Sequence, residues 1–295
     1  MTNSISEIEE ERTPPLKAYF RKLMRSKTGF VGTVIVAFVL LMATVGPFVA
    51  PHDPARLDPS VILMPPVWFE GGDARFLLGT DNLGRDILSR LIFGSQVSLL
   101  VGLCSVVVAG LIGLLVGLIA GFYGGFFDIV FMRLVDSFLA IPSILFSLVV
   151  LAVVGPGLVT LILVIGVTNW VIYARLVRGE VLSIKERDYI RAARSIGVRN
   201  ITIIYRHILP NVFSSFVVVS TLTIATTIIV EASLSFLGLG IQPPTVSWGG
   251  MLSDGRNYLA TNWWLATFPG LAITVTVLGI IFLGDWLRDV LDPRA

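Results

Sequence analysis

Residues 97–122 read VSLLVGLCSVVVAGLIGLLVGLIAGF, a run without a single charged side chain. A helix needs about 20 mostly apolar residues to cross the hydrocarbon core of a bilayer, so this run predicts a transmembrane helix. The whole chain is similar in character: of its 295 residues, 55% are apolar and 14% are charged, against about 25% charged residues in soluble domains. This composition excludes a soluble enzyme, a disordered protein and a nucleic-acid-binding protein, and it predicts a polytopic membrane protein.

Five further windows are long and apolar enough to span a bilayer. The third span contains Arg133 and Asp136, the fifth contains Glu231, and the others contain no charge. We therefore predict an all-α fold with six transmembrane helices. The five further windows are Gly29–Ala50, Ile129–Val154, Leu158–Ala174, Val212–Leu239 and Leu265–Leu283.

Basic residues are distributed unequally between the two sides of the predicted membrane. With the N-terminus in the cytoplasm, 17 of the 22 Lys and Arg residues fall on the cytoplasmic side. The positive-inside rule favours this orientation, with both termini cytoplasmic. The predicted order is a cytoplasmic N-terminal segment (1–28), a first transmembrane helix (29–50), an external segment (51–95), a five-helix core (96–287) and a cytoplasmic tail (288–295).

The core contains one large cytoplasmic segment, residues 175–211, with eight basic and three acidic residues. Its central part, residues 185–211, reads KERDYIRAARSIGVRNITIIYRHILPN. Gly197 is expected to break a first short helix. Such a helix would present mostly small side chains on one face, which is typical of a docking surface for another protein. The residues on that face are Tyr189, Ala192, Ala193 and Ile196.

A second short helix is expected over Ile201–Ile208, capped by Asn200 and ended by Pro210. The segment would then form a helical hairpin. No G-x-x-x-x-G-K-[ST] motif occurs in the chain, so the chain has no phosphate-binding loop of its own. Any function that uses ATP would therefore need a partner to supply the energy.

This hairpin resembles the cytoplasmic loop of permease subunits of bacterial ABC importers, which reads E-A-A, three residues, Gly, nine residues, Ile, one residue, Leu-Pro. Arg191 and His207 replace the leading Glu and the Ile, as is usual in the dipeptide/oligopeptide/nickel branch. LGTDNLGRDILSRL at 78–91 and EASLSFLGLG at 231–240 are similar to the C-type subunit of that branch. The residues that match the ATPase-coupling loop are Arg191, Ala192, Ala193, Gly197, His207, Leu209 and Pro210.

The resemblance implies a type I ABC importer permease fold in the bacterial inner membrane. It implies a second homologous permease, two ATPase subunits that use ATP and Mg²⁺, and an external substrate-binding protein. The chain itself would bind no metal or cofactor and would have no catalytic residue. Short peptides are the implied cargo, and a nickel chelate or another small solute is the alternative. A carrier driven by an ion gradient and working alone is the competitor from a different class.

A charged side chain inside a transmembrane span costs free energy of insertion, so its presence requires an explanation. Arg133 and Asp136 are three residues apart, which predicts a local ion pair with Arg133 reaching to the inner surface. Asp136 is also a candidate for the translocation path or for the contact with the second permease. Glu231 is expected either to face the cavity or to pair with a group on the partner permease.

Small residues and prolines predict the helix packing. Gly113, Gly117 and Gly121 form a double G-x-x-x-G step, which allows two membrane helices to approach closely. Pro142 and Pro269 are expected to kink the third and sixth spans.

One further short helix is expected outside the spans. In the external segment, Asp81 or Asn82 is expected to cap a helix that ends at Arg90.

Overall fold

The computed structural model describes residues 21–291, and it is helical where the chain was predicted to cross the membrane. Five helices are long and apolar enough to span a bilayer, and a sixth span results if a bent pair of helices counts as one. This confirms the predicted all-α membrane fold. The predicted cytoplasmic segment 1–28 lies mostly outside the described residues, and so does the end of the predicted tail 288–295. The helices are α3 (Lys27–Thr44), α4 (Gly46–Val49), α5 (Ile87–Tyr123), α6 (Gly125–Leu139), α7 (Ser143–Val154), α8 (Leu158–Lys185), α9 (Asp188–Ser195), α10 (Asn200–Ile203), a π-helix (Ile204–Ile208), α11 (Leu209–Phe236), α12 (Trp248–Gly255) and α13 (Trp264–Leu291), with short 3₁₀ turns at Pro59–Val61 and Arg256–Tyr258.

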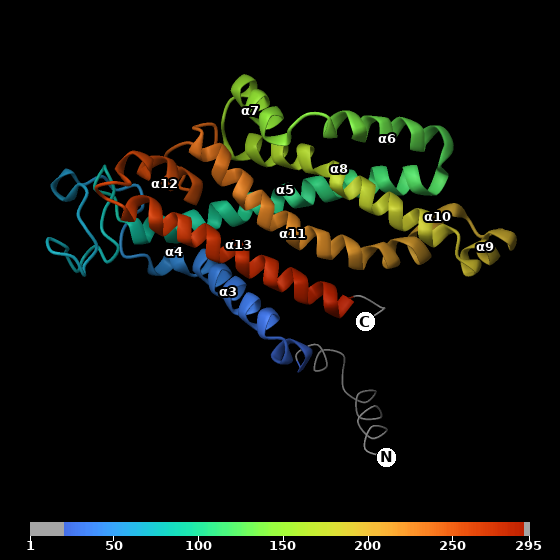
Figure 1. The fold of residues 1–295 in the computed structure, drawn as a ribbon, viewed down its shortest axis with the longest axis horizontal. Helices are drawn as coiled ribbons and strands as arrows, with labels where there is room; N and C mark the ends of the chain where they lie inside the picture. Colours follow the sequence, from blue (N-terminus) through green and yellow to red (C-terminus); the bar gives the residue numbers. More distant parts are fainter. Residues whose placement is uncertain (1–20, 292–295) are drawn as a thin grey trace, which may run out of the picture.

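The long helices run side by side and separate two irregular ends (Figure 1). At one end, residues 50–86, which we call the connecting segment, lie beside α12. At the other end, α9 and α10 project beyond the bundle; residues 186–208 there are called the hairpin. Helix α3 begins, and α13 ends, on the side of the hairpin (Figure 1).

Helices α5 and α8 form the most extensive helix–helix contact of the described residues. The G-x-x-x-G step of α5 faces α8, and this is the close helix contact that the sequence predicted without naming the partner. A Cβ atom on Gly117 would lie 2.7 Å from Cβ of Val177, and one on Gly121 would lie 2.8 Å from Cβ of Val181. Only glycine permits this approach, because the neighbouring atoms belong to the body of the facing helix.

The third span differs from its prediction as a single kinked helix. Helices α6 and α7 meet at a bend of 84° across residues 140–142. Pro142 is the N-cap of α7, because a proline has no N–H to continue the preceding helix and restricts the residue before it. Pro269, by contrast, lies inside an uninterrupted α13.

Two predicted helix boundaries were also wrong. Helix α5 is capped by Asp86, whose carboxylate accepts a hydrogen bond from the backbone N–H of Ser89 at 2.9 Å, and not by Asp81 or Asn82. The helix then continues through Arg90 into the membrane span.

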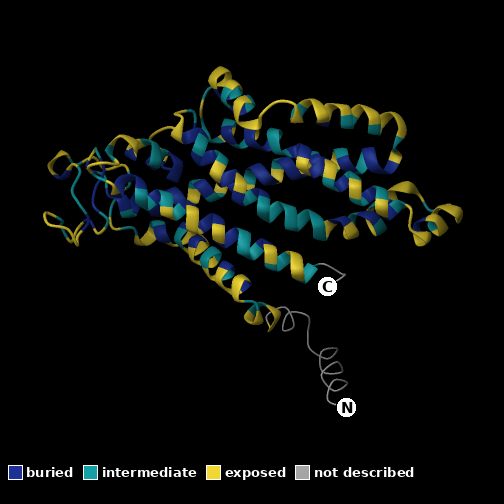
Figure 2. Cartoon of the chain, in the orientation of Figure 1, coloured by how far each residue is buried: buried dark blue, intermediate teal, exposed yellow. Residues whose placement is uncertain are grey.

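Burial is greatest along the centre of the bundle, while the outer faces of α6 and α7 and the hairpin are largely exposed (Figure 2).

Candidate coupling surface and buried polar sites

The hairpin is held on the bundle by an apolar cluster beneath α9. Ile190, Ile203 and Ile208 are fully buried and pack with Val181 and Ile184 of α8. Burial of each such side chain contributes about 1.5–3 kcal/mol. The hairpin is therefore a fixed extension of the bundle.

Gly197 ends α9 in the way the sequence predicted. Its φ is +80°, a region in which glycine is at no steric disadvantage. The backbone N–H of Gly197 donates to Arg194 O at 3.0 Å, and that of Val198 donates to Ala193 O at 3.0 Å. These two bonds are a Schellman motif, with Gly197 at its C′ position.

The second half of the hairpin differs from its prediction. Arg199, not Asn200, is the N-cap of α10. Pro210 lies in the first turn of α11 and does not end a helix, because the missing N–H of proline is harmless in a first turn. A π-helical turn over Ile204–Ile208 joins α10 to α11.

The seven predicted coupling residues lie along this one hairpin and its junction with α11. Arg191 binds Glu186 at 2.8 Å, and this hydrogen bond and the charge of Arg191 lower the pKa of Glu186. The ring of His207 lies 6.0 Å from that of Tyr189, so the π-helix packs against α9. Ala192 and Gly197 are exposed and Ala193 is half-buried. The remaining two residues, Leu209 and Pro210, open α11.

The outer surface of the hairpin carries large apolar side chains that the predicted docking face did not include. Ile201 is 68% exposed and Tyr205 is 74% exposed; Ile196, which was predicted, is 80% exposed. Exposed apolar side chains of this size on one hairpin are candidates for an interaction site. Ile201 and Tyr205 are four residues apart in the sequence, and this spacing could have found them.

Asp136 and its neighbours connect α6 to α8. Asp136 lies 2.6 Å from Arg175, and both side chains are about half exposed. The predicted ion pair between Arg133 and Asp136 was therefore wrong, because a basic residue on the facing helix takes its place. Asp128 and Arg178 form a second bridge between the same two helices, with Nη2 and Oδ2 2.7 Å apart.

Both expectations for Glu231 need correction, because its side chain is fully buried within the chain. Its carboxylate accepts hydrogen bonds from Ser235 at 2.8 Å and from Ser98 of α5 at 3.4 Å. The Ser98 hydroxyl in turn accepts a bond from the backbone N–H of Trp248, at the start of α12, at 3.3 Å. Glu231 therefore joins α5, α11 and α12, and it faces neither an open cavity nor the outer surface.

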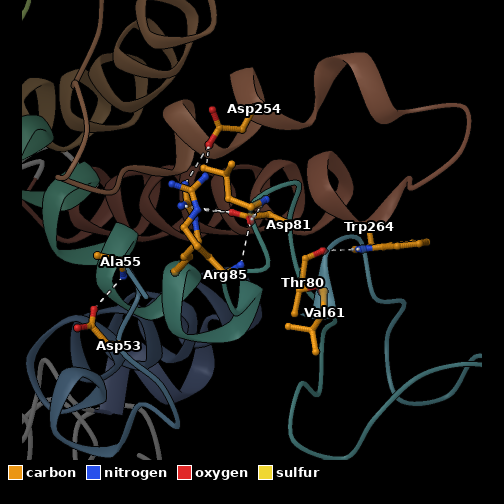
Figure 3. Close-up of polar contacts among 10 residues, drawn as sticks. Asp53, Ala55, Val61, Thr80, Asp81, Arg85, Asp254 and Trp264 are labelled. Atoms are coloured by element: carbon orange, nitrogen blue, oxygen red, sulfur yellow. Dashed lines mark hydrogen bonds and ion pairs between the residues drawn. The ribbon is translucent and has the colours of Figure 1, made fainter. Parts of the chain in front are cut away.

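A cluster of ion pairs fixes the connecting segment to the bundle (Figure 3). Arg85 binds Asp81 at 2.7 Å and Asp254 of α12 at 3.0 Å. Arg90 lies 3.3 Å from Asp81 and 3.1 Å from Asp254. Nearby, the indole N–H of Trp264 donates to the carbonyl oxygen of Thr80 at 3.3 Å. Within residues 21–291 no group of three or more His, Cys, Asp or Glu side chains could hold a metal ion.

These features define a multi-span membrane protein, with an exposed helical hairpin at one end and a connecting segment fixed by ion pairs at the other. The chain belongs to the family of binding-protein-dependent transport system inner membrane components, whose pattern matches residues 113–295. The N-terminal TM domain of oligopeptide transport permease C matches residues 15–66. Both matches confirm the resemblance drawn from the hairpin motif, and they remove the independent ion-coupled carrier as an alternative.

Relatives align along almost the whole chain. The di/tripeptide transport system permease protein DppC of Pseudomonas aeruginosa is 42% identical over 95% of this chain and 92% of its own length. The dipeptide transport system permease protein DppC of Escherichia coli is 44% identical over 95% and 93%. A chain of the MetNI methionine ABC transporter has a TM-score of 0.57 at 21% identity, covering 68% of this chain and 96% of its own, which supports the fold alone.

Proposed function

We propose that the chain is a permease subunit of an ATP-driven importer of short peptides, and that it lines the translocation path together with a second homologous permease. Two ATPase subunits would hydrolyse ATP with Mg²⁺, and an external binding protein would deliver the cargo. The peptide class is supported by the relatives, which are named as di- and tripeptide or dipeptide permeases. The family membership supports the binding protein as a partner.

The observation that carries the proposal is the two-sided structure of the hairpin. Its inner side is anchored by fully buried isoleucines, whereas its outer side exposes Ile196, Ile201 and Tyr205. An anchored apolar surface transmits force well, because it cannot move without moving α8 and α11. We infer that this surface docks into the ATPase subunit and that Arg191, Ala192, Ala193, Gly197, His207, Leu209 and Pro210 form or position it.

The orientation follows from the same proposal. The ATPases are cytoplasmic, so the hairpin end of the bundle faces the cytoplasm and the connecting segment faces outward. Both termini are then cytoplasmic, which agrees with the excess of Lys and Arg on that side. Asp136 lies on the half-exposed α6, and we place it and Arg175 at the boundary with the second permease.

The substitution Gly197→Asp tests the docking role. No atom lies within 4 Å of the position of a Cβ on Gly197, and Asp tolerates a positive φ better than most residues. The fold should therefore survive, while a charge enters the docking surface. In cells that carry the other subunits, we expect normal abundance of the variant in the membrane, dipeptide uptake reduced at least tenfold, and ATP hydrolysis no longer coupled to uptake.

Gly71→Asp is the matched control. Gly71 has a φ of +85° and its nearest neighbour would lie 3.9 Å away, but it belongs to the connecting segment at the opposite end. Uptake should stay near the wild-type rate in this variant. Normal uptake by Gly197→Asp would contradict the proposed function of the hairpin.

A further inference from the structure

The connecting segment encloses a polar cavity that the transport function has not used. Its volume is about 190 Å³. Cavities for drug-sized ligands have volumes of about 300–1,000 Å³, so this one suits a smaller molecule. Six of its lining side chains are acidic, basic or imidazole: His52, Asp53, Arg56, Asp58, Arg75 and Asp86.

Two side chains that line the cavity each carry a buried polar atom without a hydrogen-bond partner in residues 21–291. Asp86 is 2% exposed; its Oδ2 accepts bonds from the N–H and the hydroxyl of Ser89, but its Oδ1 has no partner. Nδ1 of His52 is also buried and without a partner, and it lies 3.6 Å from Oδ2 of Asp86. Buried polar atoms are normally hydrogen-bonded, so an unmatched pair of this kind requires an explanation.

The chemistry of these two atoms indicates what would satisfy them. An ionised carboxylate oxygen only accepts hydrogen bonds, and Nδ1 of a neutral imidazole accepts when the proton is on Nε2. The ring of His52 is held in place by stacking on Phe76, with centroids 4.8 Å apart. A primary ammonium group carries three donors and a positive charge, and it can bond to both atoms at once.

The opposite charge is found at the exposed side of the cavity. Arg56 and Arg75 are exposed, and both are near enough to Asp58 to help lower its pKa, although hydrogen bonds from Ser60 are the larger cause. Arg75 is already bound to Asp73 at 2.8 Å. Across residues 21–291, Arg56 forms no ion pair within 4 Å, so its guanidinium can bind a carboxylate.

The other two carboxylates of the cavity are engaged locally. Asp53 accepts a bond from the backbone N–H of Ala55 at 2.8 Å (Figure 3). Asp58 accepts bonds from the N–H and the hydroxyl of Ser60 at 3.0 and 2.5 Å. Asp86 is therefore the carboxylate that has a buried oxygen available for a ligand.

We propose that this cavity is a binding site for a small zwitterion, an amino acid or a dipeptide. The ammonium group would bind Oδ1 of Asp86 and Nδ1 of His52, and the carboxylate would bind Arg56. The ligand class is that of the proposed cargo, and this part of the inference rests on the proposed function. The site itself rests on the cavity and lies in the connecting segment, away from the hairpin.

Binding to the purified full transporter, without ATP and without the binding protein, tests the site independently of transport. The probe is L-alanyl-L-alanine, measured by isothermal titration, with N-acetyl-L-alanyl-L-alanine as the analogue that lacks the ammonium group. We expect Asp86→Asn to weaken binding of the dipeptide at least tenfold. Asn is as good an N-cap as Asp, so this variant should keep α5 intact. Glu70→Gln, an exposed change of the same charge in the same segment, should bind normally.

A chemical footprint locates the bound dipeptide. The chain has two histidines, His52 and His207, and they lie at opposite ends of the molecule. Diethyl pyrocarbonate carbethoxylates histidines, and peptide mapping reports the extent of reaction at each one. The bound dipeptide should slow the reaction of His52 relative to that of His207. The rate at His207 corrects for reagent that the dipeptide itself consumes. The proposal is overturned if the dipeptide does not bind, if the acetylated analogue binds equally well, or if Asp86→Asn and the footprint at His52 show no effect. If Gly197→Asp abolishes uptake but the dipeptide still binds, the proposed zwitterion site is unaffected. If Gly197→Asp transports normally, only the proposed coupling role of the hairpin is contradicted.

Discussion

Asp254 of α12 and Arg90 near the start of α5 are 164 residues apart in the sequence, yet Oδ2 of one lies 3.1 Å from Nη2 of the other. Arg90 is buried and shares Asp254 with Arg85, and both arginines also contact Asp81. Two positive and two negative charges thus meet where the connecting segment, α5 and α12 join. This arrangement compensates charges that would be costly to bury singly.

Asp81→Asn should destabilise this junction. Asn can keep the bonds that Asp81 accepts from the N–H groups of Leu83 and Arg85, at 2.8 and 3.0 Å, but it removes the charge that faces two largely buried arginines. Breaking a buried pair costs about 3–5 kcal/mol, and we expect about 3 kcal/mol here because Asp254 remains. The melting temperature of the purified protein in detergent would report the loss.

The control for this change is Asp73→Asn. Asp73 pairs with Arg75 at 2.8 Å, but the two side chains are 31% and 67% exposed. Exposed pairs contribute about 0–1 kcal/mol, so the melting temperature should hardly change. Equal shifts of the melting temperature in Asp81→Asn and Asp73→Asn would show that burial of the ion-pair cluster does not add to stability.

The main elements of this fold were predictable because they depend on local composition. An uncharged apolar run defines a span wherever it occurs, and Gly113, Gly117 and Gly121 predicted a close helix contact from their spacing alone. Gly197 likewise predicted the end of α9, since few other residues adopt a positive φ. These features require no knowledge of what lies opposite in space.

The features that sequence reasoning missed depend on distant partners. Glu231 could not be placed because Ser98 and Trp248, which complete its network, come from two other helices. Pro142 is compatible with a kink or with a complete break, and local pattern does not distinguish them. The exposed Tyr205 was missed because the predicted docking face was limited to the first helix of the hairpin.

Gly117→Val should disrupt the contact between α5 and α8. A Cβ on Gly117 would lie 2.7 Å from Cβ of Val177 and 2.8 Å from the carbonyl oxygen of Ala174. The two helices must then separate, and overpacking of this kind costs about 1–3 kcal/mol or more. We expect a lower melting temperature and less folded protein by size-exclusion chromatography.

Gly179→Val is the same substitution at a helical glycine of α8 with no atom within 4 Å of the Cβ position. Valine is a better helix former than glycine, so this variant should be as stable as the wild type. If Gly117→Val were equally stable, the glycine step would not set the distance between α5 and α8.

Arg178→Ala should loosen α6. This helix has a single buried residue, Val135, so the bridge from Asp128 to Arg178 contributes much of its attachment to α8. We expect amide hydrogen exchange across residues 125–139 to become about tenfold faster, which corresponds to about 1.4 kcal/mol. Arg133→Ala removes an exposed arginine of α6 that forms no ion pair within the described chain, and it should leave exchange unchanged.

A charge reversal distinguishes the ion pair from a general effect of losing Arg178. The double substitution Asp128→Arg with Arg178→Asp should recover part of the protection, because the same two positions can pair in the opposite sense. The two single substitutions, Asp128→Arg and Arg178→Asp, are measured alongside. If amide exchange in the double variant is as fast as in each of them, the two residues do not interact directly.

Glu231→Gln should leave the selectivity of transport unchanged. Glu231 is fully buried among Ser98 and Ser235, so a charged peptide does not meet it. Gln can accept a hydrogen bond from one of these hydroxyls through its amide oxygen and donate one to the other hydroxyl through its NH₂ group. Relative uptake of cationic, neutral and anionic dipeptides should match the wild-type pattern. Glu231→Leu should instead lower the melting temperature, because each buried hydroxyl left without its acceptor costs about 1–3 kcal/mol. A selective loss of one charge class in Glu231→Gln, at normal abundance, would place the carboxylate on the translocation path after all.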